Sequence, residues 1–174
     1  MGDNSLEIRP LHSADRVRSL KLIEKAHIPL RVFFRKHAKN SSKANITKTY
    51  VAATIGDDPL IAGYISLMLG EIAISGQYSI SDKPSVDSYD YQPAVRIARL
   101  AVGDGWRKKG IGETLVQAAI GICLESICPI VGCRFIILEA KAGAKEFYER
   151  LGFRRLEGTK ADDLVYFFDL HKIE

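Results

Sequence analysis

A short turn that contains two glycines, Arg107-Lys108-Lys109-Gly110-Ile111-Gly112, has the residue types needed to bind a phosphate group. It lies between a β-prone segment and a segment with helical periodicity. Unpaired backbone N–H groups and the positive end of a helix dipole should therefore meet at this turn. Its three cations add formal charge, and a side chain at either glycine would hold an anion away from the amides. The turn predicts a pyrophosphate-binding loop.

Two common phosphate loops do not fit this turn. A Walker loop needs Lys and then Ser or Thr after its second glycine, but Gly110 is followed by Ile111. A dinucleotide fingerprint needs a third glycine, but Gly112 is followed by Glu113-Thr114-Leu115. What remains is Arg-x-x-Gly-x-Gly, directly after the predicted strand Leu100-Ala101-Val102.

A second segment, from Ala144 to Phe153, reads Ala-Lys-Glu-Phe-Tyr-Glu-Arg-Leu-Gly-Phe. Its apolar residues recur at helical spacing, which predicts a short amphipathic helix, and Gly152 favours a left-handed helix end. Tyr148 within this segment is either a core tyrosine or a catalytic general acid. A phenol with a pKa near ~10 can protonate a thiolate of pKa around ~8.5 in a pocket with little water.

Together, the two motifs resemble those of the GCN5-related N-acetyltransferase (GNAT) superfamily, in the same order and at roughly the same separation. The resemblance implies an α/β (mixed α+β) GNAT fold, in which helices flank a central, mostly antiparallel twisted sheet and the cofactor cleft lies between the two central strands. It also implies acetyl-coenzyme A as the cosubstrate and N-acetyl transfer as the reaction.

The resemblance further implies a role for each motif. The pantetheine arm should pair with the backbone of the central strand, the pyrophosphate should take the loop amides, and Tyr148 should protonate the departing coenzyme A thiolate. For Leu100 and Ala101 a plain core position is the alternative. The implied cofactor-binding residues are Leu100, Ala101, Val102, Arg107, Lys108, Lys109, Gly110, Ile111 and Gly112.

The general base is less evident than the acid. Many GNAT members carry a glutamate on the central strand, but this strand offers Arg96 and Arg99, and the nearest carboxylate is Glu71. An exposed charge at a strand end is the alternative for Glu71. The lack of a base suggests an amine that is already partly neutral, which fits an α-amino group of pKa ~7.7 to 8.0 better than a lysine near ~10.4.

A basic stretch lies in the N-terminal half. Seven of its residues are Lys or Arg between Lys25 and Gly56 and none is acidic, although the net charge of the whole chain is only +4. In the helix predicted after Pro29, four apolar residues share one face. Three cations line another face, which we expect to point outward; they are Arg31, Arg35 and Lys39. Both a polyanion partner and a solvated lysine-rich face fit this pattern.

The pattern of the N-terminal half is similar to the TacT-like toxin branch of the superfamily. That resemblance implies acetylation of the α-amine of aminoacyl-tRNA, which stops translation, and a ribbon-helix-helix type antitoxin as partner. Candidate tRNA contacts are Arg31, Arg35, Lys36, Lys39, Arg96 and Arg99. The alternatives are a GNAT enzyme acting on a protein N-terminus, a lysine or a small amine, and a non-catalytic acetyl-coenzyme A-binding module. A homodimer is a further expectation from the family.

The rest of the chain predicts one N-acetyltransferase domain, residues 1–174. Its expected elements are a strand at Leu6–Arg9, a helix from Ser13 towards Ala26, a hairpin of Thr49–Ile55 and Leu60–Leu69, a long loop at Ser75–Gln92, a strand at Val95–Val102, a helix with Ile111, Leu115, Ala118 and Ile122 on one face, a strand at Phe135–Leu138 that is buried on both faces, and a final strand at Leu164–Leu170.

Composition excludes several other classes. No apolar run reaches the ~18 residues that a bilayer span needs, and no signal peptide is evident, so we expect a cytoplasmic protein. The three cysteines form no C-x-x-C pair and the four histidines are scattered. Reduced, mostly buried thiols and no metal site are therefore expected.

Overall fold

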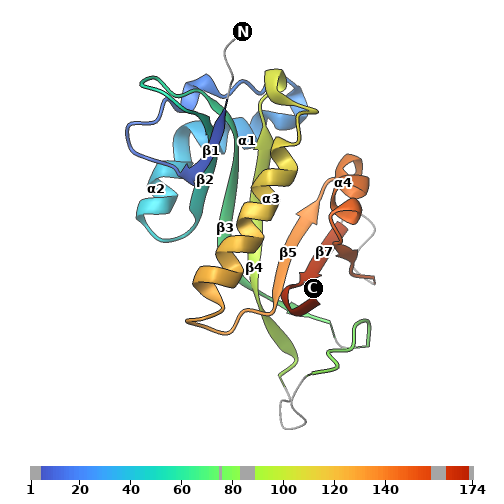
Figure 1. Ribbon diagram of the computed structural model, residues 1–174. Helices are drawn as coiled ribbons and strands as arrows, with labels where there is room; N and C mark the ends of the chain where they lie inside the picture. Colours follow the sequence, from blue (N-terminus) through green and yellow to red (C-terminus); the bar gives the residue numbers. More distant parts are fainter. Residues whose placement is uncertain (1–4, 75, 83–88, 158–163, 173–174) are drawn as a thin grey trace. The chain divides into compact units, whose positions relative to one another are not determined.

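The computed structural model describes residues 5–74, 76–82, 89–157 and 164–172. Hydrogen bonds join its strands in the order β1-β2-β3-β4-β5-β7-β6 (Figure 1). The β4–β5 pair is parallel, whereas the β1–β2, β2–β3, β5–β7 and β6–β7 pairs are antiparallel. The expected mixed α/β class with a mostly antiparallel sheet is confirmed.

The chain divides into two compact units, which are described separately. Unit 1 comprises Met1–Met68 and Ala98–Ala119, and unit 2 comprises Leu69–Ile97 and Ile120–Glu174. Two long strands, β3 (Ile61–Ala73) and β4 (Tyr91–Val102), contribute residues to both units. No helix in the described ranges is long and apolar enough to cross a membrane.

Unit 1 contains the edge strand β1 (Leu6–Pro10), which pairs with β2 (Lys48–Thr54), and the predicted hairpin of β2 with β3. A core cluster covers this part of the sheet, and the ring of Phe34 stacks on the buried ring of Tyr64 with 4.5 Å between their centroids. The last long helix, α3 (Ile111–Ile122), begins where the sequence predicts it.

The prediction of a helix from Ser13 towards Ala26 is wrong. The segment forms only two short 3-10 turns, Val17–Ser19 and Lys25–His27, with extended chain between them. Leu20 and Leu22 are both 1% exposed and belong to the core of unit 1. Residues two apart point to the same side only in extended chain, so burial of this pair overrides the local helix signal.

The helix after Pro29 is confirmed, although it is not uniform. It consists of α1 (Ile28–Val32), a wider π-helical turn at Phe33–His37, and α2 (Ala38–Lys43). Its predicted apolar face packs inward, since Phe33, Phe34 and Ala38 are buried and Leu30 is partly buried against them.

Unit 2 is built on β5 (Phe135–Ala140), whose first four residues are at most 1% exposed, as predicted for a strand buried on both faces. It pairs with β7 (Leu164–Asp169), which pairs with the short β6 (Arg154–Arg155). A π-helical turn at Cys123–Ile127 follows α3. Part of the expected Ser75–Gln92 loop lies outside the described residues, and its last two residues belong to β4.

The second sequence motif forms α4 (Lys145–Arg150) and the turn that ends it. Gly152 has a φ of +86°, the left-handed conformation that its position predicts. Single 3-10 turns also occur at Asp104–Trp106, Ala142–Ala144 and Leu170–Lys172. The three cysteines are free thiols; Cys123 is buried, but Cys128 and Cys133 are only partly buried.

Candidate active site

The predicted pyrophosphate loop connects the turn at Asp104–Trp106 to α3 in unit 1. Lys108 has a φ of 60° and Gly110 a φ of 77°, so two residues of the loop are left-handed. The Thr114 N–H donates to the Gly110 carbonyl at 3.0 Å, which makes Gly110 the residue before the first helical turn. The N–H groups that precede Thr114 in this turn therefore have no intrahelical acceptor. Left-handed residues beside a helix N-terminus form the kind of concave amide cluster that binds anions.

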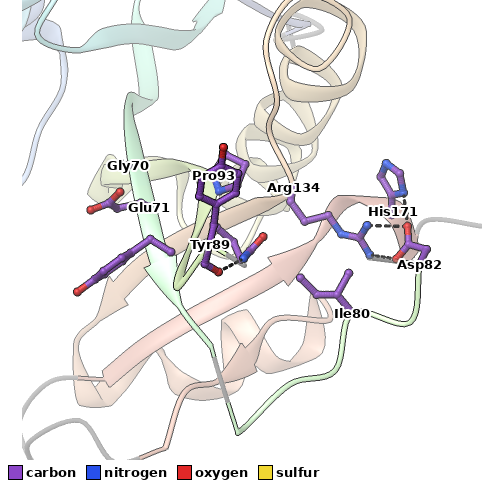
Figure 2. Close-up of a pocket in the computed structure, with 10 residues that line it drawn as sticks. Gly70, Glu71, Ile80, Asp82, Tyr89, Pro93, Arg134 and His171 are labelled. Carbon is purple, nitrogen blue, oxygen red and sulfur yellow. Dashed lines mark hydrogen bonds and ion pairs between the residues drawn. The ribbon is translucent and has the colours of Figure 1, made fainter. Parts of the chain in front are cut away.

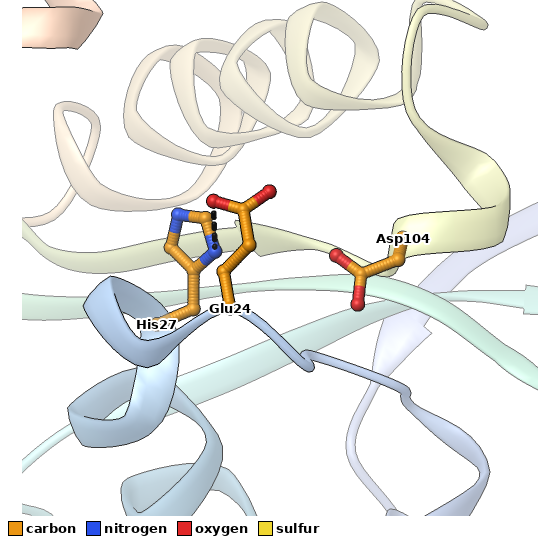
Figure 3. Close-up of side chains that lie close together, drawn as sticks. All are labelled: Glu24, His27 and Asp104. Carbon is orange, nitrogen blue, oxygen red and sulfur yellow. Dashed lines mark ion pairs between the residues drawn. The ribbon is translucent and has the colours of Figure 1, made fainter.

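The side chain of Arg107 is bound within unit 1. Its guanidinium donates to Glu24 and, at 2.9 Å, to Nδ1 of His27, and its Nη2 lies 2.7 Å from Oδ1 of Asp104. Figure 3 shows the three partner side chains, which come from the segment before α1 and from the turn before the loop. The sequence did not reveal Glu24 or His27, because they lie about eighty residues before Arg107.

Those three partners are also close enough to share a metal ion, since their ligand atoms lie within 4.8 Å of one another. The Arg107 guanidinium binds all three and supplies the positive charge that a metal would bring. The arrangement is therefore an arginine-binding cluster. The cluster involves the side chain of Arg107.

The part of β4 expected to pair with pantetheine lies beyond its pairing with β5. The parallel register joins Ala94–Ile97 to Phe135–Leu138, and Leu100, Ala101 and Val102 follow it. The side chain of Ala101 is buried in the core of unit 1. A core side chain is compatible with a backbone role, because pantetheine pairing uses only the N–H and C=O groups of a strand.

Tyr148 lies on α4 in unit 2 and is 8% exposed. Its ring makes edge contacts with Phe147 and Phe153, at centroid distances of 4.9 and 5.7 Å, and a tilted contact with Tyr166 at 6.3 Å. Burial raises the pKa of Tyr148 to about 12. In the part of the chain that the structure describes, its hydroxyl has no hydrogen-bond partner. The phenol is thus protonated at neutral pH and available as a donor.

Glu71 lies elsewhere in unit 2, at a cavity of about 670 Å³ (Figure 2). The cavity is lined by residues at the start of β4 and by Arg134, which immediately precedes β5. Tyr148 instead follows the C-terminal end of β5. Glu71, on β3, therefore lines a cavity beside the N-terminal end of β5, whereas Tyr148 follows its C-terminal end, and Glu71 does not fit as a base acting beside Tyr148.

The three cations expected to point outward are partly buried, and each donates to a backbone carbonyl. Arg31 donates to the Leu22 carbonyl at 2.9 Å and Arg35 to the Leu20 carbonyl at 3.2 Å. Lys39 donates to the carbonyls of Ser13 and Asp15 at 2.6 and 2.8 Å. These cations satisfy backbone groups of the extended segment that the sequence had predicted to be helical. Among the described residues, Lys36 is exposed and makes no ion pair or hydrogen bond with its side chain.

The two β4 cations are also engaged. In unit 2, Arg96 forms an ion pair of 2.8 Å with Glu139. In unit 1, the Arg99 guanidinium lies 4.0 Å from the centroid of the Phe33 ring, as in a cation–π contact. These two positions of the central strand thus hold engaged arginines and no carboxylate base, as the sequence indicated.

Comparison with known families identifies the class of protein. A family model described as "Acetyltransferase (GNAT) domain" matches residues 48–155. The chain therefore belongs to the GNAT acetyltransferase family and is an N-acetyltransferase, and this family uses acetyl-coenzyme A as the acetyl donor.

Solved structures share this fold over almost the whole chain. A tyrosine-to-phenylalanine mutant of KacT is 24% identical, with a TM-score of 0.82 and 95% of each chain covered. AtaT complexed with acetyl-methionyl-tRNAfMet is 24% identical, with a TM-score of 0.82 and 97% of each chain covered. AtaTR bound with acetyl-coenzyme A is 24% identical, with a TM-score of 0.78, and the match covers 95% of this chain and 94% of that one.

Proposed function

We propose that this acetyltransferase is a toxin that acetylates the α-amine of aminoacyl-tRNA and so blocks translation. The observation that carries the proposal is the match to AtaT complexed with acetyl-methionyl-tRNAfMet, which extends over 97% of both chains. An α-amine also fits the central strand, where Arg96 and Arg99 stand in place of a carboxylate base. Such an amine is partly neutral near pH 7 and needs little help to lose its proton.

The cofactor site is proposed in two parts. The amides of Arg107 to Gly112 bind the pyrophosphate of acetyl-coenzyme A, and the backbone of Leu100, Ala101 and Val102 pairs with its pantetheine arm. The left-handed φ angles of Lys108 and Gly110 and the helix end at α3 support the first part. The end of the β4–β5 pairing at Ile97 supports the second.

Tyr148 is the proposed catalytic acid. The neutral amine attacks the thioester carbonyl, a C–N bond forms, the C–S bond breaks, and Tyr148 donates its proton to the departing thiolate. The proton of the attacking nitrogen is released to water. A phenol whose pKa is raised to about 12 by burial retains this proton until the thiolate develops. Structures of a tyrosine-to-phenylalanine mutant of KacT and of one of AtaT are known.

The tRNA-binding surface is proposed to use cations that the fold leaves free. Lys36 retains its role as a candidate contact, whereas Arg31, Arg35, Lys39, Arg96 and Arg99 are already engaged with other groups. In unit 1, Lys25 and Lys43 of the same acid-free stretch are also exposed, and among the described residues their side chains form no ion pair or hydrogen bond. Neutralisation of backbone phosphates by such residues gives affinity that falls steeply with salt.

A partner protein is the third element of the proposal. AtaT has been solved bound to the C-terminus of the antitoxin AtaR, and a KacTA–DNA complex is also known. We therefore propose a small ribbon-helix-helix type antitoxin, encoded beside this chain, and a homodimer of the toxin. Sedimentation of the purified protein with and without the neighbouring gene product tests both assemblies.

The decisive experiment uses labelled acetyl-coenzyme A and bulk charged tRNA, with uncharged tRNA and the Tyr148→Phe variant as controls. Label that remains on the aminoacyl group after nuclease digestion, and only with charged tRNA, supports the proposal. Label on peptide N-termini, lysine or small amines but on no aminoacyl-tRNA would assign one of the other GNAT activities. Binding of acetyl-coenzyme A without transfer to any amine would instead indicate a binding module.

A further inference from the structure

Four contacts in unit 1 connect the segment before α1 to the turn before the cofactor loop. The Asp104 N–H donates to the Lys21 carbonyl at 2.9 Å, and the Ile23 N–H donates to Oδ2 of Asp104 at 2.7 Å. Arg107 binds Glu24 and His27, as described above, and its Nη2 lies 2.7 Å from Oδ1 of the same Asp104. Asp104 therefore contacts both the segment and the arginine.

The Arg107 cluster, defined as Arg107 with Glu24, His27 and Asp104, is well suited to hold one orientation. A guanidinium presents several N–H donors in a rigid plane, so acceptors on different sides fix its position, which a lysine ammonium does not provide. The side chains of Arg107 and Asp104 are 34% and 24% exposed, so water competes only partly for these contacts. Glu24 is 57% exposed and contributes less.

The next three residues have few anchors of their own. Lys108, Lys109 and Gly110 are exposed, and among the described residues their side chains make one contact, in which Lys109 Nζ lies 5.1 Å from the centroid of the Trp106 ring. An alanine Cβ at Gly110 would meet no atom within 4 Å. The loop is thus held at one end by α3 and at the other by Arg107.

We propose that Glu24, His27 and Asp104 are positioning residues for the cofactor loop: they hold Arg107 and thereby pre-organise the amides that follow it. A loop already in its binding conformation loses less entropy when the anion binds, so affinity rises without a new contact to the ligand. The inference rests on the proposed role of Arg107 to Gly112 in binding acetyl-coenzyme A. It adds Glu24 and His27, from the segment before α1, and Asp104, from the turn before the loop, to the residues that serve that role.

The test compares the dissociation constant of acetyl-coenzyme A, by calorimetry, with kcat at saturating acetyl-coenzyme A. Asp104→Asn removes the carboxylate charge that faces Arg107 and should weaken binding about tenfold, and Glu24→Gln about threefold. The kcat should remain within about twofold, because Tyr148 is not altered. Asp58→Asn is the matched control, since Asp58 forms an ion pair with Arg16 elsewhere in unit 1.

A double-mutant cycle separates positioning from a general loss of structure. Arg107→Ala should weaken binding at least as much as Asp104→Asn, and Asp104→Asn should add nothing in the Arg107→Ala background. Additive losses, or unchanged affinity in Asp104→Asn and Glu24→Gln, would overturn the inference. His27→Asn provides a second variant of the cluster if Asp104→Asn does not fold.

The loop assignment itself is tested by Gly110→Val, because a β-branched residue is strained at a φ of 77°. If this variant binds acetyl-coenzyme A normally, the proposed pyrophosphate loop is wrong. If it binds weakly while the Arg107 cluster variants bind normally, only the positioning role fails.

Discussion

The cofactor loop of unit 1 and the Tyr148 helix of unit 2 are held by different forces. Arg107 is held by charged and polar groups, two of which lie about eighty residues earlier in the chain. Tyr148 is held by aromatic packing, and two of its three ring partners among the described residues, Phe147 and Phe153, belong to its own motif. A charged anchor needs acceptors at defined angles, whereas an aromatic anchor needs only bulk nearby, which a short motif can provide.

The same contrast occurs between two neighbours on the basic helix. Arg35 donates to a backbone carbonyl of the extended segment, and its Nε is buried without a partner in the described residues. Lys36 is exposed and free. Two adjacent cations therefore differ in role: Arg35 stabilises the fold, whereas Lys36 lies on the surface.

The largest expected effect is on turnover, through the aromatic site. Tyr148→Phe removes the proposed acid but keeps the ring, so kcat should fall about 100-fold or more, the lower range for general acid catalysis. The dissociation constant of acetyl-coenzyme A should stay within about twofold. Tyr166→Phe is the control, because that hydroxyl already binds Glu149 at 3.3 Å. Equal turnover in Tyr148→Phe and wild type would remove Tyr148 from the chemistry.

The next effect is on stability, through the packing around Tyr148. Phe153 is 3% exposed, so Phe153→Ala should lower the free energy of unfolding by about 3 kcal/mol, as expected for a truncated core phenylalanine. Phe153→Leu keeps most of the volume and should lose about 1 kcal/mol. Urea unfolding measures both changes. If the leucine variant loses as much as the alanine variant, the ring geometry of Phe153 matters and bulk alone does not hold Tyr148.

A smaller effect separates the two neighbours on the basic helix. Arg35→Ala should lower the free energy of unfolding by about 1 to 2 kcal/mol, because the Leu20 carbonyl loses its donor. Lys36→Ala should change it by less than about 0.5 kcal/mol, as is usual for an exposed side chain. For aminoacyl-tRNA the order should reverse, with Lys36→Ala reducing the salt dependence of binding. Equal stabilities of the two variants would show that Arg35 is as free as Lys36.

The smallest expected effect is an absence of change with pH. Burial disfavours the phenolate of Tyr148 and raises its pKa to about 12, so the acid remains protonated as the pH rises through the ordinary tyrosine range near ~10. The kcat at saturating substrates should therefore show no alkaline decline between pH 8 and 10. A decline with a midpoint near 9, present in wild type and absent in Tyr148→Phe, would contradict the raised pKa.

Local patterns predicted much of the fold and both motifs. The β2–β3 hairpin, the buried strand Phe135–Leu138 and the helix after Pro29 follow from residue periodicity. The left-handed turn at Gly152 follows from the low steric cost of glycine there. These features depend on neighbours along the chain, so they can be predicted without knowing the tertiary contacts. The GNAT family match covers both motifs.

Features that depend on distant partners were not predictable in this way. The segment from Ser13 to Ala26 has a plausible cap and helical composition, yet burial of Leu20 and Leu22 keeps it mostly extended. The backbone carbonyls of this non-helical segment then accept hydrogen bonds from Arg31, Arg35 and Lys39. One override of local propensity therefore explains both the missing helix and the engagement of these three cations.

The loop from Arg107 to Gly112 shows most clearly what the sequence determined and what only the tertiary structure decided. By itself, the sequence determined that Arg107 to Gly112 is a glycine-containing turn before a helix, because glycine conformation and helix periodicity are local properties. Only the tertiary structure decided that the Arg107 side chain binds Glu24, His27 and Asp104, while Lys108 and Lys109 are exposed. A cation is free or bound according to which acceptors lie within about 3 Å of it, and that proximity exists only in the folded chain.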